Sequence, residues 1–256
     1  KRIIRPIWDY YGYERAWKPT DITGNHYHLP SLDKRCSAME TLLDKINNTN
    51  ETFLFTYRGQ PSDSWVKKFF KQQGIEFAHV GNTAHVSKKE LQCHKLWPDF
   101  CRGKPTSLKQ IKDFWQYLGS KVIVRGKGKE TFEDWIDRDY TIYNLIDKKY
   151  LKDTATQETD FCLVRTQRGK KEDHEKRLIY IRKILKKGFD DGEVRVKYAN
   201  IHTVKGLTFD NVVVDLTTTR LEDYFTQLRL KYVAYSRGKF DCWTVASQGK
   251  YTLGVR

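Results

Sequence analysis

Residues 52–80 read TFLFTYRGQPSDSWVKKFFKQQGIEFAHV. The first six of these residues form a short apolar run rich in aromatic and β-branched side chains, which predicts a buried strand. Ser62 or Asp63 can cap a following helix, and Gly74 is a typical residue to end it. Residues 75–80 predict a second strand. A strand, a helix and a strand in this order are typical of a parallel α/β sheet.

Similar patterns continue on both sides of this unit. Further strands are expected at residues 26–29, 161–165, 194–201, 212–216 and 242–246, and helices at residues 33–46, 172–187 and 221–236. Residues 86–160 interrupt the alternation, with helical stretches near 107–118 and 131–149. We interpret residues 86–160 as an inserted, mostly helical subdomain between two parts of one α/β domain, 1–85 and 161–256.

The composition favours a polyanionic partner. The chain has 256 residues, a formal net charge of +15 and 39% hydrophobic residues, so it can build a core and wholesale disorder is excluded. Residues 161–256 carry 20 basic and 11 acidic side chains, the largest excess in the chain. Lysine and arginine bind phosphates with release of counterions, which makes nucleic acid the expected partner. No apolar stretch is long enough for a membrane span, and no signal-peptide core follows the basic start.

The cysteines indicate reduced thiols. The chain has five, an odd number, and no pair has the C-x-x-C form. Cys93, His94 and Cys101 lie close together in sequence, but their spacing is not that of a zinc site, so no metal site is expected. We therefore expect a cytoplasmic protein, of a bacterium or of a virus-infected host cell. The only methionine is Met39, so we also expect the chain to be a piece of a longer one.

The most informative segment is residues 201–214, IHTVKGLTFDNVVV. It predicts a polar loop between two strands. Lys205 and the hydroxyl of Thr203 can bind phosphate, and His202 can stack or donate a hydrogen bond. Gly206 allows a close approach of the backbone to a ligand. An ordinary surface loop is the alternative.

Two segments together resemble one known family. Residues 201–214 resemble the fifth conserved motif of superfamily 1 helicases of the UvrD/Rep type, T-x-H-x-x-K-G-[LS]-E-[FW]-x-x-V. Residues 228–239, LRLKYVAYSRGK, resemble the sixth, R-R-L-x-Y-V-A-x-[ST]-R-A-K. The resemblance implies that Arg237 is an arginine finger, since a guanidinium can stabilise charge on a transferring phosphoryl group. It also implies that Gly206 and Thr208 lie on the nucleotide side, with Thr208 standing where the motif has glutamate.

The same resemblance assigns strand contacts. In the family, the loop of the fifth motif also touches single-stranded DNA, which implicates His202, Thr203 and Lys205. A weaker match joins residues 53–60 and the helix after them to the family pattern L-x-R-[ST]-N, with Gly74-Ile-Glu-Phe77 in place of the strand GIPY. It implies further contacts with single-stranded DNA from Thr56, Tyr57 and Arg58, where Tyr57 could stack on a base and Arg58 could bind a phosphate.

The resemblance implies the C-terminal RecA-like domain of an ATP-dependent DNA helicase that acts on single strands and duplex junctions. The chain contains no phosphate-binding loop of the form G-x-x-x-x-G-K-[ST], so ATP and Mg²⁺ would be held by a missing N-terminal RecA-like domain. This chain alone is not expected to hydrolyse ATP. The alternative is a module that binds single-stranded nucleic acid without ATPase activity. A nuclease is less consistent with the sequence, because no dense carboxylate cluster for two metals is evident.

Overall fold

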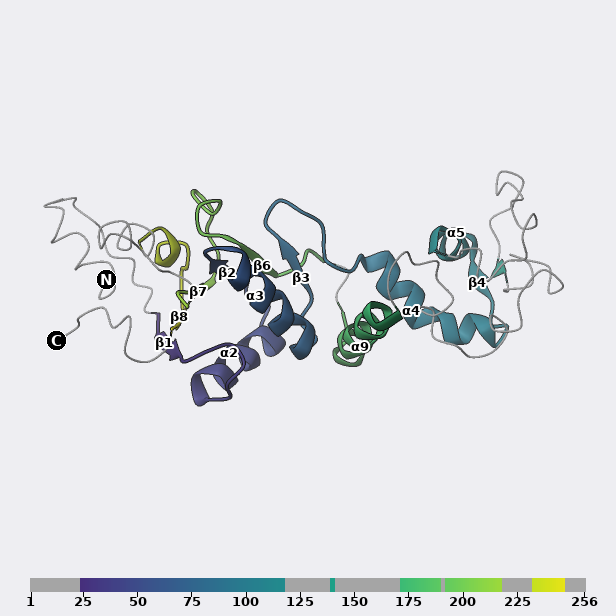
Figure 1. Ribbon diagram of the computed structural model, residues 1–256. Coiled ribbons are helices and arrows are strands. Elements are labelled where there is room, and N and C mark those ends of the chain that lie inside the picture. The colour runs from purple at the N-terminus through teal and green to yellow at the C-terminus, as the bar shows by residue number, and fades with distance from the viewer. Residues whose placement is uncertain (1–23, 118–138, 141–170, 190–191, 218–231, 247–256) are drawn as a thin grey trace, which may run out of the picture. The chain divides into compact units, whose positions relative to one another are not determined.

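The computed structural model describes residues 24–117, 139–140, 171–189, 192–217 and 232–246. It divides into two compact units (Figure 1). One consists of Lys1–His85 with Gly192–Arg256, and the other is Val86–Asp191. The expected helix at 131–149 and the expected strand at 161–165 lie outside the described residues.

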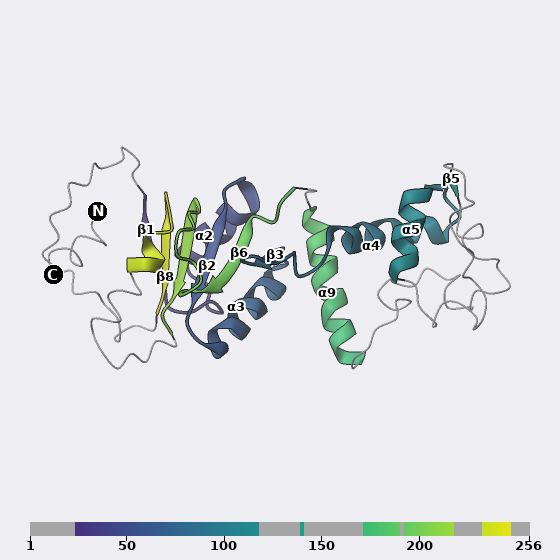
Figure 2. The same cartoon turned by 90° about the horizontal axis from the view of Figure 1, so that it is seen from above.

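The first unit is a parallel α/β sheet of six strands. They are β1 (His26–Leu29), β2 (Phe53–Tyr57), β3 (Phe77–His79), β6 (Val196–Asn200), β7 (Asn211–Asp215) and β8 (Cys242–Val245). Their order in the sheet is β1-β8-β7-β2-β6-β3, and every pair among them is parallel (Figure 2). The predicted α/β class is therefore confirmed, and all their carboxyl ends meet at one edge of the sheet.

Helices α2 (Ser37–Asn48) and α3 (Gln60–Gln73) cover one face of this sheet. The Phe55 ring of β2 packs edge-on against the Phe70 ring of α3, with centroids 4.7 Å apart. On the same face, the Trp243 indole N–H of β8 donates to the Ala38 carbonyl of α2 at 3.2 Å. The alternation of side chains along a strand sends the neighbours of Phe55 and Trp243 to the opposite face.

The opposite face carries a second apolar cluster. It consists of Leu54, Ala199, Ile201, Val204, Phe209, Val212, Val214, Leu216, Ala234, Tyr235, Cys242 and Ala246. The cluster joins the four strands β2, β6, β7 and β8 to the segment 201–210 and to a helical turn at 232–235, which lies across the sheet from α2 (Figure 1). Of the helix expected at 221–236, only this last part lies in the described residues, and it is helical.

The ends of α3 show one correct and one wrong prediction. Gly74 ends the helix with a φ of 63°, in the left-handed region that glycine adopts without strain. The predicted cap by Ser62 or Asp63 is wrong, because the helix begins one turn earlier at Gln60 behind Gly59, which has no side chain to cap it. Asp63 instead pairs with Lys67 one turn further on, at 2.6 Å.

The second unit contains helices α4 (Lys88–Cys101), α5 (Leu108–Tyr117) and α9 (Lys171–Lys187), with a short antiparallel pair of β4 (Thr106–Ser107) and β5 (Asp139–Tyr140). The predicted helix at 107–118 is confirmed by α5. The helix predicted at 172–187 is confirmed by α9, although it belongs to this unit and not to the unit that contains the sheet. Helix α4 was not predicted.

Burial explains how the second unit holds together. The rings of Trp97 and Phe100 on α4 pack against Phe114 on α5, with the two phenylalanine centroids 4.8 Å apart. Glu90, buried on α4, accepts two hydrogen bonds from the Arg177 guanidinium on α9, at 3.1 and 2.8 Å. This paired geometry offsets the cost of removing the carboxylate from water.

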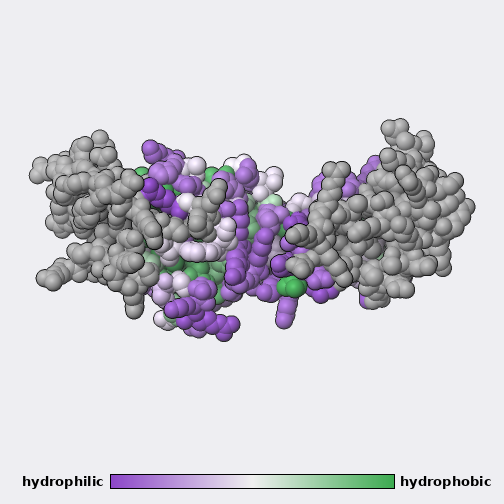
Figure 3. Space-filling view, viewed as in Figure 1, coloured by the Kyte–Doolittle hydropathy of each residue, from purple (hydrophilic) through white to green (hydrophobic). Residues whose placement is uncertain are grey.

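In the described part of the chain, no helix is both long enough and apolar enough to cross a membrane. The described surface seen in Figure 3 is mostly hydrophilic, with smaller hydrophobic areas between.

Candidate functional site

The segment 201–210 runs along the strands, from the edge of the sheet where they end to the edge where they begin. It leaves β6 at the carboxyl edge and returns to the amino end of β7. Ile201, Val204 and Phe209 are buried in the cluster on the sheet's second face and act as anchors. Five residues between and beside these anchors are exposed: His202, Thr203, Lys205, Gly206 and Thr208. The spacing of the anchors therefore presents to solvent all five residues that the sequence implicated in this segment.

Hydrogen bonds fix the first half of the segment. The His202 backbone N–H donates to the Asn200 side-chain oxygen at 3.0 Å, and the Thr203 hydroxyl donates to the Asn200 carbonyl at 2.8 Å. The Thr203 N–H donates to the same carbonyl at 2.9 Å. The His202 backbone and the Thr203 side chain are thus held at the carboxyl edge of the sheet, directly after β6.

Gly206 has a φ of +79°, a value that costs an L-residue about 1–2 kcal/mol. An added Cβ would meet no atom of the described chain within 4 Å, so the backbone conformation, and not a lack of space, requires glycine. We expect Gly206→Ala to lower the free energy of unfolding of the chain by roughly 1–2 kcal/mol in urea denaturation. Gly188 also has a positive φ, 83°, and open space around it. Gly188→Ala is the matched control and should cost about as much, so a loss in Gly188→Ala without a loss in Gly206→Ala would contradict the left-handed backbone conformation at residue 206.

Arg237 lies beside the second half of the segment. Its Nη1 donates to the Leu207 carbonyl at 3.0 Å, its Nε to the Val233 carbonyl at 3.1 Å and its Nη2 to the Ser236 hydroxyl at 2.8 Å. A backbone hydrogen bond also connects the two segments, since the Phe209 N–H donates to the Arg237 carbonyl at 2.8 Å. The two motif-like segments are therefore neighbours at the amino end of β7, and the guanidinium is held half-buried against its own unit.

A cavity lies at the carboxyl edge of the sheet, where the parallel strands end. After β2 the chain runs to α3 on one face, whereas after the neighbouring β6 it runs to segment 201–210 on the other face. Such a switch point opens a crevice at the carboxyl ends of parallel strands, where ligands bind in open α/β sheets. A cavity of about 380 Å³, which we call the switch-point cavity, lies here. It is lined by Tyr57, Gly59, Asp63, Lys67, His79 and Asn200.

The polar groups of this cavity are paired with one another. Lys67 binds Asp63 at 2.6 Å, and its ammonium lies 5.5 Å from the centroid of the Tyr198 ring. The hydrogen bond to Asp63 raises the pKa of Lys67. Burial raises the pKa of Tyr57, and the hydrogen bond with Asp63 and the charge of that carboxylate raise it further. The cavity therefore presents a protonated lysine and a neutral phenol at physiological pH.

The three residues implicated at the end of β2 lie in different surroundings. Thr56 is 1% exposed, and its hydroxyl donates to the Val213 carbonyl of β7 at 3.3 Å. A direct contact of Thr56 with a ligand would require the pair of β2 and β7 to open. Tyr57 is 8% exposed, with its ring against Tyr198 at a centroid distance of 6.1 Å. Of the three, Arg58 alone is half-buried and not buried.

The structure brings together side chains that sequence reasoning missed. Lys67, His79 and Asn200 line the cavity, and the sequence implicated none of them in binding DNA or a nucleotide. Asn200 and His79 each end a strand of a parallel sheet, and this position was the available signal. Cys93, His94 and Cys101 lie buried on α4, and the described residues contain no group of three or more potential ligands that could hold a metal ion.

No known protein family and no curated protein sequence matches this chain.

Proposed function

We propose that this chain is the C-terminal motor domain of an ATP-dependent DNA helicase, a RecA-like domain carrying an inserted helical subdomain. It contacts single-stranded DNA at the carboxyl edge of its sheet. It supplies an arginine to an ATP site whose phosphate loop and Mg²⁺ ligands belong to another domain of the complete protein. The proposal rests on the two motif-like segments, 201–214 and 228–239.

One observation carries the proposal further than the sequence does. Segment 201–210 places His202 and Thr203 at the carboxyl edge of the sheet, while its Leu207 carbonyl binds Arg237 at the amino end of β7. One short segment thus links a surface suited to a strand with a residue suited to a nucleotide. In this proposal, domain closure around ATP shifts one end of the segment, and the buried anchors carry the shift to the other end.

The exposed residues define the strand contacts in this proposal. Lys205 and the half-buried Arg58 would bind phosphates, and His202 and Thr203 would contact sugar or base. Thr56 supports β2 instead, because its hydroxyl is bonded within the sheet. Tyr57 lines the switch-point cavity and would contact the DNA strand there through its phenol hydroxyl.

A specific observation also favours the alternative, a single-strand-binding module without ATPase activity. Arg237 already donates to two carbonyls and a hydroxyl of its own unit. These bonds occupy all three guanidinium nitrogens. In the helicase proposal the two further N–H groups, one on each Nη, reach the phosphate, whereas in the alternative Arg237 serves only to join two loops.

Salt dependence of binding tests the strand contacts. We expect the chain to bind single-stranded DNA with an affinity that falls steeply with salt, and Lys205→Ala to reduce the slope of log affinity against log salt by about 0.7, the loss of one phosphate contact. Lys239→Ala removes the same charge from a lysine paired with Asp210 at 3.3 Å, and should leave the slope nearly unchanged. A flat salt response, or equal effects of the two variants, would argue against Lys205 as a phosphate contact.

A further inference from the structure

A second cavity, of about 290 Å³, lies at the carboxyl ends of β7 and β8. Trp65, Lys68 and Phe69 of α3 line one side, three residues that share a helix face, and Asp215 of β7, Val245 of β8 and Asp33 line the rest. The proposed function makes no use of this cavity. Its volume is at the lower end of the range for small-molecule pockets, which suits a single flat ring system.

Trp65 lines the cavity and is unusually exposed for a tryptophan. Its side chain is 52% exposed, although tryptophan is among the residues that proteins bury most. An exposed indole beside a cavity offers a flat aromatic face on which another ring can stack.

Asp215 gives the cavity a hydrogen-bond acceptor. It is 4% exposed, and its Oδ1 accepts from the Thr217 N–H at 2.8 Å and from the Thr217 hydroxyl at 2.6 Å. Within the described residues, both hydrogen bonds to the Asp215 carboxylate go to Oδ1, and none goes to Oδ2. A buried carboxylate oxygen that lines a cavity is suited to accept from an N–H group of a ligand.

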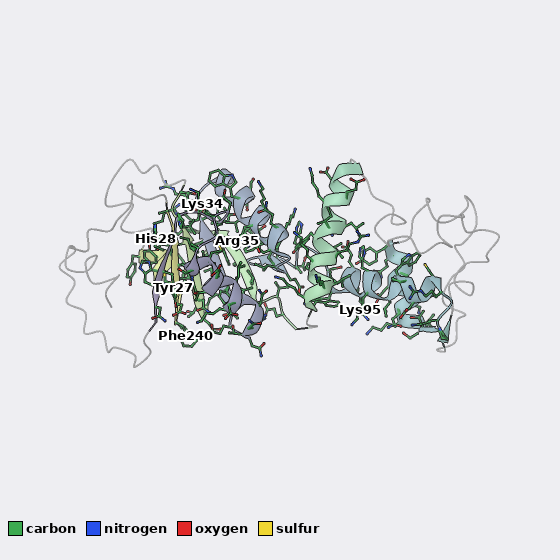
Figure 4. All side chains as sticks on the ribbon, turned by 90° about the horizontal axis from the view of Figure 1, so that it is seen from below. Tyr27, His28, Lys34, Arg35, Lys95 and Phe240 are labelled. Carbon is green, nitrogen blue, oxygen red and sulfur yellow. The ribbon has the colours of Figure 1, made fainter. Side chains whose placement is uncertain are left out.

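Two lysines, Lys34 and Lys68, lie near Asp33, which lines this cavity. Lys68 lines the cavity, and Lys34 and Arg35 are exposed on the loop between β1 and α2 (Figure 4). Ser31 donates a hydrogen bond to the exposed Asp33 carboxylate, and this bond, with smaller contributions from the charges of Lys34 and Lys68, lowers the pKa of Asp33. Lys34 and Lys68 thus outnumber Asp33, the exposed carboxylate of the rim, and can bind a phosphate there, while the second carboxylate of the lining, Asp215, is buried.

We propose that this cavity binds an unpaired nucleobase, which stacks on Trp65 and donates its exocyclic amino group to Asp215 while its phosphate lies near Lys68 and Lys34. The inference deepens the proposed function, because it gives the single strand a base-binding subsite away from segment 201–210. The same chemistry is offered by a free mononucleotide, and the experiment below separates the two sources.

The test measures binding of the whole chain to fluorescein-labelled oligodeoxycytidine and oligothymidine by anisotropy. Trp65→Ala should weaken binding of oligodeoxycytidine about tenfold, the effect of removing one base–aromatic stack, whereas Trp65→Phe should retain most of the affinity. Ser64→Ala, at an exposed neighbouring position outside the cavity, is the matched control and should bind as the unaltered chain does.

Base preference tests the role of Asp215 separately from folding. Cytosine has an exocyclic amino group where thymine has a carbonyl, so the chain should prefer oligodeoxycytidine by about tenfold, the contribution of a hydrogen bond to a charged group. Asp215→Asn can turn an N–H toward thymine and should bring the ratio to about one. Affinity for oligothymidine that is at least as high as that of the unaltered chain would show that this variant is folded.

The outcomes distinguish this inference from the proposed function. Salt-dependent strand binding with no effect of Trp65→Ala and an unchanged base ratio in Asp215→Asn overturns the nucleobase site and leaves the helicase proposal standing. Binding of cytidine monophosphate that depends on Trp65 and Asp215, without any binding of oligonucleotides, supports the nucleobase site and overturns the strand proposal.

Discussion

Replacing Arg237 with alanine in the complete protein should lower the rate of ATP hydrolysis stimulated by single-stranded DNA by about 10³-fold or more, the range found for arginine fingers. The physical reason is that a permanently charged, planar guanidinium stabilises the charge that develops on the transferring phosphoryl group. Affinity for single-stranded DNA should change by much less, because the proposed strand contacts, His202 and Thr203, are hydrogen-bonded to Asn200 and not to Arg237. Both quantities are measured on the same preparations, by steady-state hydrolysis and by anisotropy.

The lysine variant refines this experiment. Arg237 also binds the Leu207 carbonyl at 3.0 Å, so its loss removes a support of segment 201–210. Arg237→Lys keeps a charge that can bind this carbonyl but lacks the planar fork, so strand affinity should be normal and hydrolysis should stay low. Loss of strand affinity as large as the loss of hydrolysis would instead identify Arg237 as a structural link between the two loops.

Trp243→Ala should lower the free energy of unfolding by about 3–5 kcal/mol, the cost of removing a large ring from a close-packed core. Trp243 is 0% exposed at the centre of β8, and its ring stacks on Tyr27 of β1 with centroids 4.9 Å apart. Its indole N–H also binds the Ala38 carbonyl of α2. Urea denaturation, followed by circular dichroism, measures the change.

Trp243→Phe separates packing from hydrogen bonding. It keeps an aromatic ring and loses the bond to Ala38, so it should cost less than the alanine variant, by roughly half. A loss below about 1 kcal/mol in Trp243→Ala would contradict the buried position of this ring between β1 and α2.

The sheet could be predicted because its strands carry their signals locally. The apolar run at Phe53–Tyr57 and the glycine at 74 identify a strand and a helix end without reference to the rest of the chain. Helix α4 was missed because its buried face includes the polar residues Glu90 and His94, and the burial of Glu90 depends on Arg177, far away in the sequence. The place of α9 was missed for the same reason, since its Arg177 binds Glu90 of α4.

Only part of the candidate site could be predicted from the sequence, for a similar reason. The residues of segment 201–210 are contiguous, so a motif could identify them, and the structure exposes all five implicated positions to solvent. The cavities are formed by residues from separate strands and from α3, and sequence spacing does not show which of them meet. Lys67 and Asn200 are an example, because both line the switch-point cavity although α3 and β6 lie far apart in the sequence.

The most direct measurement is the rate of ATP hydrolysis by the complete protein with and without single-stranded DNA. A helicase motor should hydrolyse ATP slowly alone and much faster when single-stranded DNA is present, and Arg237→Ala should abolish the increase. Salt-dependent binding of single strands with no ATP hydrolysis under either condition would contradict the motor and identify a single-strand-binding module.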